Sequence, residues 1–299
     1  MGISVNEIVT GRKTFFILPD TSLMPPSYLE DLFALGFECY YISHDTRIKT
    51  EKKIETILSL FKDVILYINI DYELPGVNWN SLIYDLVQGQ GKSDSIGIMY
   101  AKRQSRGEKE KIEHHFINEI GIKCGCIQLE YQKKQNFELI AKALYANQAQ
   151  GRRKAIRAIC SPACTYTIYN KQKQETISGA LQDISLSHFT ILVQEGDLQI
   201  KLYEKILDIH FNLKGFFFRS DAVLFVERKL DKGILYVFAF TDPAGASGLD
   251  YKTKAFLVPH LYKMVSSYSN ALLEQSYKTP PLTSASGESI PAIKEVEGE

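Results

Sequence analysis

Short apolar runs alternate with amphipathic segments over the first half of the chain. Residues 13–18 and 63–70 are nearly continuous apolar runs, as in strands buried on both faces of a sheet. The expected strands are 13–18, 38–43, 63–70, 94–101 and 124–131, and the expected helices are 26–36, 47–61, 79–88, 107–120 and 135–148. This alternation predicts a five-stranded, doubly wound parallel sheet with helices on both faces. We expect any site in such a domain at the carboxyl ends of its strands.

The hydrophobic period changes after residue 148, where a polar segment around Gly151 marks a domain boundary. Runs rich in Ile, Val, Thr, Tyr and Phe follow, separated by turn residues. The expected strands are 156–169, 176–184, 188–194, 198–211, 215–227 and 233–241. Six short strands without intervening helices predict a small antiparallel β-barrel.

The end of the chain carries one further amphipathic segment. Apolar positions over 256–275 recur at helical spacing, which predicts a trailing helix that covers the barrel. The stretch from 276 onward is rich in Pro, Ser and Glu, which predicts a disordered tail. The expected organisation is therefore an α/β domain over 13–148, an all-β domain over 149–275 and a tail over 276–299.

Charge and composition narrow the range of partners. The 299 residues include 35 Lys and Arg and 35 Asp and Glu, so the formal net charge is zero. Both DNA and anionic membranes attract a basic excess, so we expect neither as a partner. No apolar run is long enough for membrane insertion and no secretory signal is recognisable, which favours the cytoplasm. Cys124 and Cys126 share one face of a strand, but no further ligands stand at suitable spacing, so no metal site is expected.

Acidic residues follow two of the expected strands of the α/β domain. Asp20 follows the first strand, and Asp71 follows the third and is succeeded by Leu74-Pro75. The stretch 13–148 thereby resembles the receiver domain of response regulators, with Asp71 at the phosphoacceptor position. The resemblance implies a magnesium-binding acidic pair after the first strand, a small hydroxyl residue after the fourth strand and a Lys after the fifth.

Three of those positions depart from the receiver pattern. The acidic pair reads Pro19-Asp20, Tyr100 stands where a small hydroxyl residue is expected, and Lys133 fits the Lys position poorly. Asp71 and Asp20 are therefore interpreted as a vestigial phosphoacceptor site in a docking or dimerisation domain. The alternative for both carboxylates is that they cap the turns that follow.

Two short motifs lie on the expected barrel. Arg153 and Arg157 form an Arg-x-x-x-Arg pair, preceded by Arg152, at the entry to the first barrel strand. The second motif, at a strand–strand junction, contains Asp183, Ser185 and His188. Together these residues resemble the PilZ domain, a receptor for the bacterial second messenger cyclic di-GMP. That family carries Asp/Asn-x-Ser-x-x-Gly in the second motif, so His188 departs from it at the glycine.

The chemistry of the resembling residues suits this ligand. The resemblance implies that Arg152, Arg153, Arg157, Asp183 and Ser185 bind cyclic di-GMP. Arginine donates in a planar fork to guanine O6 and N7 or to phosphate oxygens, and a carboxylate accepts from guanine N1 and N2. His188 lacks the backbone freedom of glycine, but its ring can stack on guanine.

We therefore expect a non-enzymatic signalling protein in which cyclic di-GMP binding rearranges the two domains and exposes or hides a surface for a downstream protein. No cofactor is expected, and a homodimer is compatible with the sequence. The alternative is a scaffold that binds proteins independently of the nucleotide. A third hypothesis is a regulator controlled by phosphorylation of Asp71.

Overall fold

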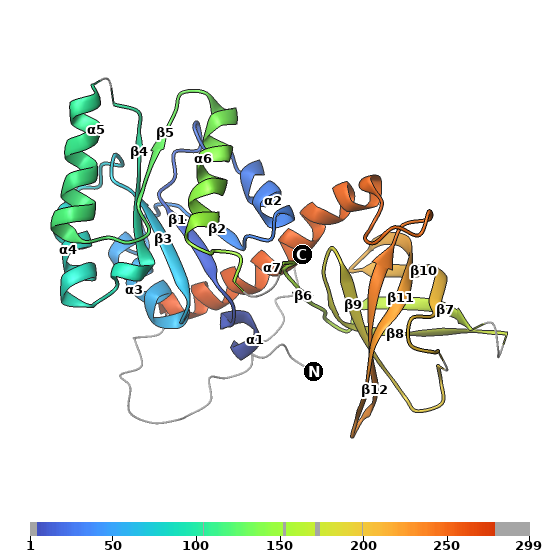
Figure 1. The fold of residues 1–299 in the computed structure, drawn as a ribbon. Coiled ribbons are helices and arrows are strands. Elements are labelled where there is room, and N and C mark those ends of the chain that lie inside the picture. The colour runs from blue at the N-terminus through green and yellow to red at the C-terminus, as the bar shows by residue number, and fades with distance from the viewer. Residues whose placement is uncertain (1–4, 104, 152–153, 171–173, 199, 279–299) are drawn as a thin grey trace. The chain divides into compact units, whose positions relative to one another are not determined.

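The computed structural model describes residues 5–278 except 104, 152–153, 171–173 and 199. Two compact units are distinguished within it (Figure 1). Residues 9–154 form an α/β unit together with the last helix from Ser269 onward, and residues 155–268 form a barrel unit together with residues 5–8.

A parallel sheet forms the centre of the α/β unit. Its strands are β1 (Lys13–Ile17), β2 (Cys39–Ile42), β3 (Val64–Asn69), β4 (Ile96–Ala101) and β5 (Cys126–Leu129), in the order β2-β1-β3-β4-β5. All neighbouring pairs are parallel. The prediction of a five-stranded doubly wound sheet is confirmed, and this strand order is the flavodoxin-like one.

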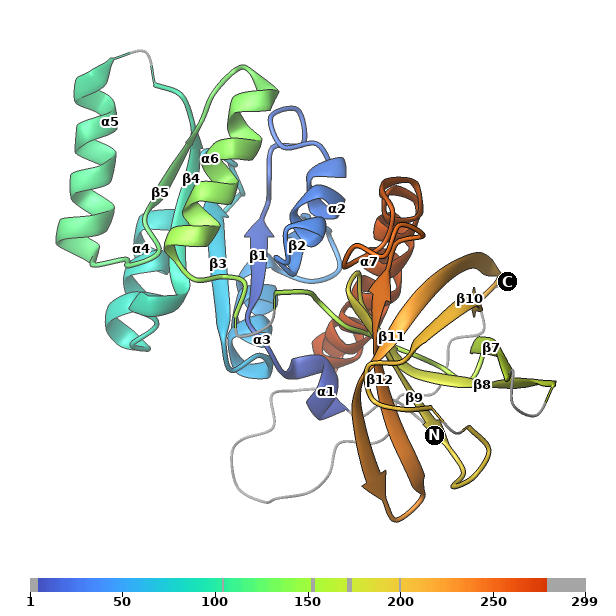
Figure 2. The ribbon, with the colours of Figure 1, turned by 45° about the vertical axis from the view of Figure 1, so that its right-hand side comes forward.

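Helices cover both faces of this sheet, as predicted. They are α2 (Ser27–Ala34), α3 (Thr50–Leu60), α4 (Trp79–Tyr84), α5 (Arg106–Glu113) and α6 (Lys133–Ala146). Helices α4 and α5 continue as π-helical segments (Asp85–Gly89 and His114–Ile120), a 3-10 turn precedes β4 (Ser93–Ser95), and a short α1 (Val5–Val9) was not expected. Ile54, Ile83 and Phe116 pack on one face. On the other face α2 and α6 lie side by side, with the Tyr28 and Phe137 ring centroids 5.3 Å apart (Figure 2).

The barrel unit is closed by strand pairing. Its strands are β6 (Ala158–Ile159), β7 (Cys164–Asn170), β8 (Glu175–Ile184), β9 (His188–Val193), β10 (Lys205–Leu213), β11 (Phe216–Leu230) and β12 (Gly233–Thr241). The order is β6-β8-β7-β10-β11-β12-β9, and an additional β8–β9 pairing closes the six longer strands into a barrel. All described pairings are antiparallel. The predicted six-stranded antiparallel barrel is confirmed.

Two strand boundaries in the barrel were predicted wrongly. The single strand expected over 156–169 is split into β6 and β7 by a turn in which Cys164 N donates to Ser161 O (2.9 Å). Pro162 lies in this turn and has no N–H to donate to a strand ladder. The strand expected from residue 198 begins only at Lys205.

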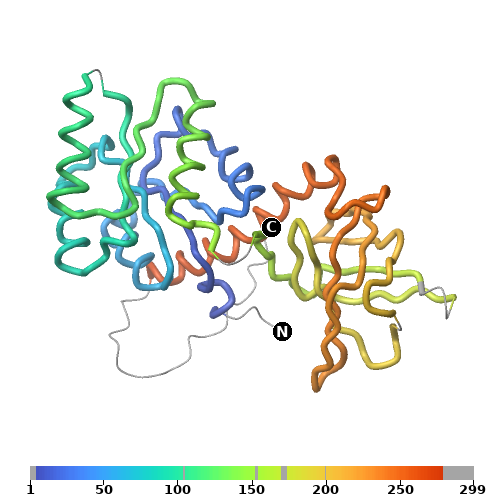
Figure 3. The backbone as a smooth tube through the Cα atoms, viewed as in Figure 1, coloured from blue at the N-terminus to red at the C-terminus, as the bar shows by residue number. Residues whose placement is uncertain are grey.

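The hairpin of β11 and β12 is the longest in the barrel unit, with Leu230 opposite Gly233 at its tip. It projects beyond the other barrel strands (Figure 3). From Phe225 to its end, β11 is exposed, whereas Ala222 and Leu224 are completely buried. The burial pattern therefore changes at Phe225.

The trailing helix α7 (Tyr251–Lys278) is longer than predicted at both ends. Asp250 caps it, because its Oδ1 accepts from the N–H groups of Lys252 (3.0 Å) and Thr253 (3.1 Å). Residues 276–278, expected in a disordered tail, are helical. The rest of that expected tail, 279–299, lies outside the described residues.

Helix α7 contributes to both hydrophobic cores. Leu257 and Leu261 are completely buried in the barrel unit, which agrees with a helix that covers the barrel. Leu273 and Tyr277 belong instead to the core of the α/β unit. In that unit the Tyr40 hydroxyl and the Ser269 Oγ are hydrogen-bonded at 2.9 Å. The second contribution was not expected from the sequence.

Candidate binding site on the barrel wall

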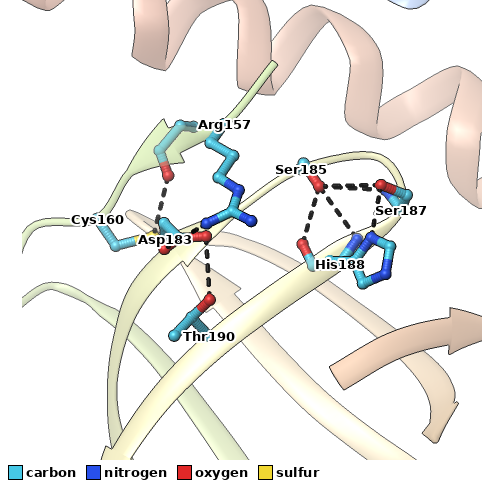
Figure 4. A network of polar contacts seen from close by, with 8 residues as sticks. Arg157, Cys160, Asp183, Ser185, Ser187, His188 and Thr190 are labelled. Atoms are coloured by element: carbon cyan, nitrogen blue, oxygen red, sulfur yellow. Dashed lines mark hydrogen bonds and ion pairs between the residues drawn. The ribbon is translucent and has the colours of Figure 1, made fainter. Parts of the chain in front are cut away.

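Strand register brings Arg157, the last residue of the first barrel motif, close to Asp183, the first residue of the second. Strand β6 pairs with the end of β8, with Ile159 opposite Asp183. Arg157 directly precedes β6, so its side chain reaches the same place on the wall (Figure 4). On the other side of β8, Asp183 is opposite Thr190 of β9. The β6–β8 pairing therefore brings Arg157 and Asp183 close together in space, although they are far apart in the sequence.

Arg157 and Asp183 form a loose ion pair. Arg157 Nη1 lies 3.6 Å from Asp183 Oδ2, and the two side chains are 38% and 22% exposed. The other carboxylate oxygen, Oδ1, accepts from the Thr190 hydroxyl at 3.1 Å. Because 3.6 Å exceeds hydrogen-bond length, this contact holds the guanidinium weakly and leaves its donors available to another acceptor.

Ser185 shapes the turn between β8 and β9. The residue is buried, and its Oγ accepts from the N–H groups of His188 (3.0 Å) and Ser187 (3.3 Å). It also lies 3.0 Å from His188 O, to which it donates (Figure 4). These are the contacts of a serine that closes a tight turn. The geometry gives Ser185 a positioning function, while its predicted contact with a ligand stays a prediction.

His188 begins β9 directly after this turn. Its Nδ1 lies 2.8 Å from Ser187 Oγ. Burial, followed by the positive charge of Arg157, lowers the pKa of His188 below its ordinary value, and Asp183 opposes this shift. The shift favours the neutral form of the imidazole. Its ring also meets Phe225, with centroids 5.8 Å apart.

Two predicted site residues are not described by the structure, and two residues near the site were not predicted. Arg152 and Arg153 lie outside the described residues. Sequence reasoning missed Phe225 and Tyr203, whose ring centroids are 6.5 Å apart and which continue the wall beyond His188. Their positions depend on a β-bulge and a left-handed backbone, and neither has a signature in this sequence.

The acidic residues of the α/β unit are held by internal contacts. Asp20 Oδ1 accepts from Ser22 N (2.8 Å) and Ser22 Oγ (2.6 Å), so it closes a turn after β1. Asp71 Oδ2 accepts from Ala101 N at 2.7 Å, and Oδ1 accepts from the Arg103 guanidinium. Asp71 does lie at the carboxyl ends of β3 and β4, where a site was expected, but both of its oxygens have partners.

The other receiver positions are also described. Tyr100 is a buried residue of β4, and burial together with the charge of Glu113 raises the pKa of its hydroxyl. Lys133 begins α6, where its carbonyl accepts from the Tyr28 hydroxyl. Arg103, which the sequence reasoning did not single out, is the cation that contacts Asp71. The receiver resemblance of this unit stays a prediction.

The described residues contain neither a metal-binding cluster nor a membrane-spanning helix. Within them, no group of three or more His, Cys, Asp and Glu side chains is placed to hold a metal ion. Burial raises the pKa of Cys124 to about 11 and that of Cys126 to about 12, so neither thiol ionises readily near neutrality. None of the helices in the described part of the chain combines the length and hydrophobicity needed to cross a bilayer.

Comparison with known proteins gives weak structural likeness. No protein-family model matches the chain, and no curated protein matches it. Among solved structures, Escherichia coli YcgR in complex with c-di-GMP is similar at 18% identity and a TM-score of 0.32, over 43% of this chain and 50% of that one. The PilZ domain of E. coli YcgR with c-di-GMP is matched over 43% of this chain and 99% of its own, at 18% identity and a TM-score of 0.31.

A third solved structure is the Bacillus subtilis inhibitor of motility (MotI/DgrA), with 13% identity and a TM-score of 0.32 over 39% of this chain and 52% of that one. The matched region thus spans about half the length of YcgR and of MotI.

Proposed function

We propose that the barrel unit binds cyclic di-GMP and that the chain is a non-enzymatic effector of this messenger. The observation that carries the proposal is the loose Arg157–Asp183 pair on the outer wall, with 3.6 Å between Nη1 and Oδ2. It combines a forked donor and a carboxylate acceptor, which is the pair of groups that the edges of guanine require. The motifs that contain both residues resemble those of the PilZ family.

In the proposed complex, Arg157 and Asp183 lose their contact with each other and each gains a contact with the ligand. The Arg157 guanidinium leaves Asp183 and donates to guanine O6 and N7 or to a phosphate, and Asp183 accepts from guanine N1 and N2. Breaking the existing pair costs little, because a partly exposed ion pair contributes only about 0–1 kcal/mol. One bidentate Arg–guanine contact discriminates against a wrong base by about 1–3 kcal/mol, so the exchange favours a guanine ligand.

The position of Arg157 also suggests how binding reaches the rest of the chain. Arg157 precedes the first barrel strand and follows the segment that connects the barrel to the α/β unit. A ligand that holds Arg157 restricts this connection and so biases how the units are arranged. In the proposed effector, that shift changes the surface presented to a downstream protein.

Calorimetric titration of the full chain with cyclic di-GMP tests the proposal. We expect micromolar or tighter binding by the wild type and no measurable binding by the Arg153→Ala, Arg157→Ala double variant. Arg219→Ala is the matched control, because Arg219 also pairs loosely with an aspartate on the barrel (3.4 Å to Asp208). Equal heats from the wild type and the double variant would refute the site.

A nucleotide-independent scaffold is the second candidate, and the turn around Ser185 favours it. The Ser185 hydroxyl is buried and engaged within the turn, so one predicted ligand contact already has internal partners. Affinity purification with the wild type and the double arginine variant, each with and without cyclic di-GMP, separates the two functions. Partners that are the same in all four samples would support the scaffold.

A further inference from the structure

Two backbone irregularities lie next to each other on the barrel wall beyond His188. The register of β11 against β12 shifts between Leu224 and Val226, so Phe225 is the extra residue of a β-bulge. Tyr203, whose N–H donates to Leu224 O (2.8 Å), has a φ of 66°. Left-handed backbone costs a residue with a Cβ about 1–2 kcal/mol, and such strain is concentrated at functional sites.

These irregularities place aromatic rings in solvent. Leu224 is completely buried, whereas Phe225 is 52% and Tyr203 is 67% exposed. The Phe225 ring lies 5.8 Å from the His188 ring and 6.5 Å from the Tyr203 ring, in edge-on arrangements of 61° and 73°. We call His188, Phe225 and Tyr203 the aromatic shelf. Exposed aromatic rings lose the free energy of burial, so a strained backbone that presents them indicates a binding surface.

Strand register connects the aromatic shelf to the Arg157–Asp183 pair. Asp183 is opposite Thr190, Thr190 is opposite Val237, and Val237 is opposite Val226, which directly follows Phe225. This row runs across β8, β9, β12 and β11 along one wall of the barrel. His188 lies within the electrostatic reach of both Arg157 and Asp183. The charged pair and the aromatic rings therefore lie at the two ends of this row of residues, which we call the strip.

We propose that the aromatic shelf stacks a purine base of the nucleotide whose polar edge or phosphate is bound by Arg157 and Asp183. This inference rests on the proposed function and assigns two residues, Phe225 and Tyr203, that neither motif contains. A purine has a polar edge and an apolar face. The strip has a charged pair at one end and aromatic rings at the other. Arg157 and Asp183 hydrogen-bond to the edge of the purine, while the aromatic rings stack on its face.

The chemistry favours a base over an aliphatic protein side chain. Aromatic rings stack on bases with about 1–3 kcal/mol per base, and a neutral imidazole takes part without adding repulsion to Arg157. The charged pair at one end of the strip supplies the donors and the acceptor that a purine edge needs. Docking of a protein on the same rings is the competing outcome, and the experiment distinguishes it.

Titration of full-length variants with cyclic di-GMP tests the aromatic shelf. Phe225→Leu keeps an apolar side chain and removes the aromatic face, and Tyr203→Leu does the same at the other ring. We expect each to raise Kd about fivefold or more, and Phe225→Tyr to retain wild-type affinity. Phe217→Leu is the matched control, since Phe217 lies on the same strand and is 72% exposed. An unchanged Kd for Phe225→Leu would overturn the inference.

A fluorescence signal reports stacking directly. The chain has a single tryptophan, Trp79 in the α/β unit, so Trp79→Phe with Phe225→Trp places the sole indole on the aromatic shelf. We expect cyclic di-GMP to quench its emission with the same Kd as in calorimetry. Emission that stays constant while the nucleotide binds would contradict stacking and leave the rings to a protein partner.

The combined results separate the two proposals. If the wild type binds and Arg157→Ala weakens binding while Phe225→Leu does not, the function stands and the aromatic shelf is refuted. If the wild type gives no heat and the Trp79→Phe, Phe225→Trp variant shows no quenching at millimolar nucleotide, both the function and the aromatic shelf are refuted.

Discussion

Two of the aspartate–arginine pairs among the described residues, Asp71–Arg103 in the α/β unit and Asp183–Arg157 in the barrel unit, differ in how firmly they are held together. In the α/β unit, Asp71 accepts from the Arg103 guanidinium with one oxygen and from Ala101 N (2.7 Å) with the other. In the barrel, Asp183 and Arg157 approach only to 3.6 Å. The same two residue types therefore make a hydrogen-bonded internal contact in one unit and a loose contact in the other.

Further contacts distinguish a structural ion pair from one that a ligand can open. Arg103 also lies over the ring of Tyr100, with its guanidinium carbon 5.6 Å from the ring centroid, so it is fixed from two sides. Arg157 has the looser contact and the larger exposure, 38% against 31% for Arg103. A ligand can displace the contact in the barrel at small cost, whereas a phosphoryl group at Asp71 would first have to displace two donors.

The largest expected effect comes from changing the shape of the donor while keeping its charge. Arg157→Lys removes the planar fork, and the affinity for cyclic di-GMP should fall about tenfold or more, because a point charge cannot donate bidentately. Arg103→Lys should leave the affinity unchanged. Calorimetry on both variants measures the contrast, and a loss of affinity in Arg103→Lys alone would reverse the assignment.

Replacing each arginine by alanine should reveal how much its pair contributes to the free energy of unfolding. Arg103→Ala leaves Asp71 half-buried with one partner fewer, and we expect its free energy of unfolding to fall by about 1–2 kcal/mol. Arg157→Ala should cost less than about 0.5 kcal/mol, because its contact is long and partly exposed. Urea denaturation of the two variants provides the measurement. Equal losses of unfolding free energy would mean that the Arg157–Asp183 pair stabilises the fold as much as the Arg103–Asp71 pair does.

A smaller effect is expected from pH, through two histidines of the barrel unit. Burial is the main cause of the lowered pKa of both His188 and His260; Arg157 adds to it at His188, and Lys263 and Lys214 add to it at His260. The unfolded chain therefore takes up protons near pH 6.5 that the folded chain excludes. Stability should be complete above that pH and fall as the pH drops from 7.5 to 5.5.

Variants assign this pH dependence to particular groups. Arg157→Ala removes a positive charge near His188, so the pKa of His188 should rise and the loss of stability between pH 7.5 and 5.5 should shrink. His260→Asn should shrink it independently, with loss of the contact between Nε2 and Leu213 O (2.8 Å). Denaturation curves at the two pH values test both expectations. Stability that rises on acidification would contradict the direction of the shifts.

The smallest expected effect is no phosphorylation at all. Because both oxygens of Asp71 are engaged, treatment with an acyl phosphate and magnesium should add no mass to the chain. Intact-mass spectrometry measures this directly. A phosphoryl adduct that disappears in Asp71→Asn would show that Arg103 yields to phosphate and would remove the contrast between the two pairs.

Hydrophobic period was sufficient to predict the elements of the α/β unit. Runs such as 63–70 are apolar on both faces, and only a strand covered on both sides buries them completely. The order of the strands, β2-β1-β3-β4-β5, comes from the structure. The contact between Asp71 and Arg103 was not predictable, because the two residues are 32 positions apart and no motif links them.

The barrel was predicted less completely, for local reasons. Pro162 interrupts the stretch 156–169, which was predicted as one strand because the residues after it, such as Ala163 and Cys164, are also apolar. Phe225 reads as an ordinary strand residue, because a bulge depends on the register of the partner strand rather than on the bulged residue. Ser185 belongs to a motif that suggested ligand contact, whereas its burial in a turn depends on the closure of β8 onto β9.

Helix α7 has a consequence for how the chain folds during synthesis. The α/β unit is translated first, yet its core includes Leu273 and Tyr277, which leave the ribosome only after the whole barrel has been made. A nascent chain that ends before Ser269 would hold a sheet with part of its apolar surface uncovered. The first unit to be synthesised is thus the last to be completed, and truncation near the carboxyl terminus should destabilise the amino-terminal unit.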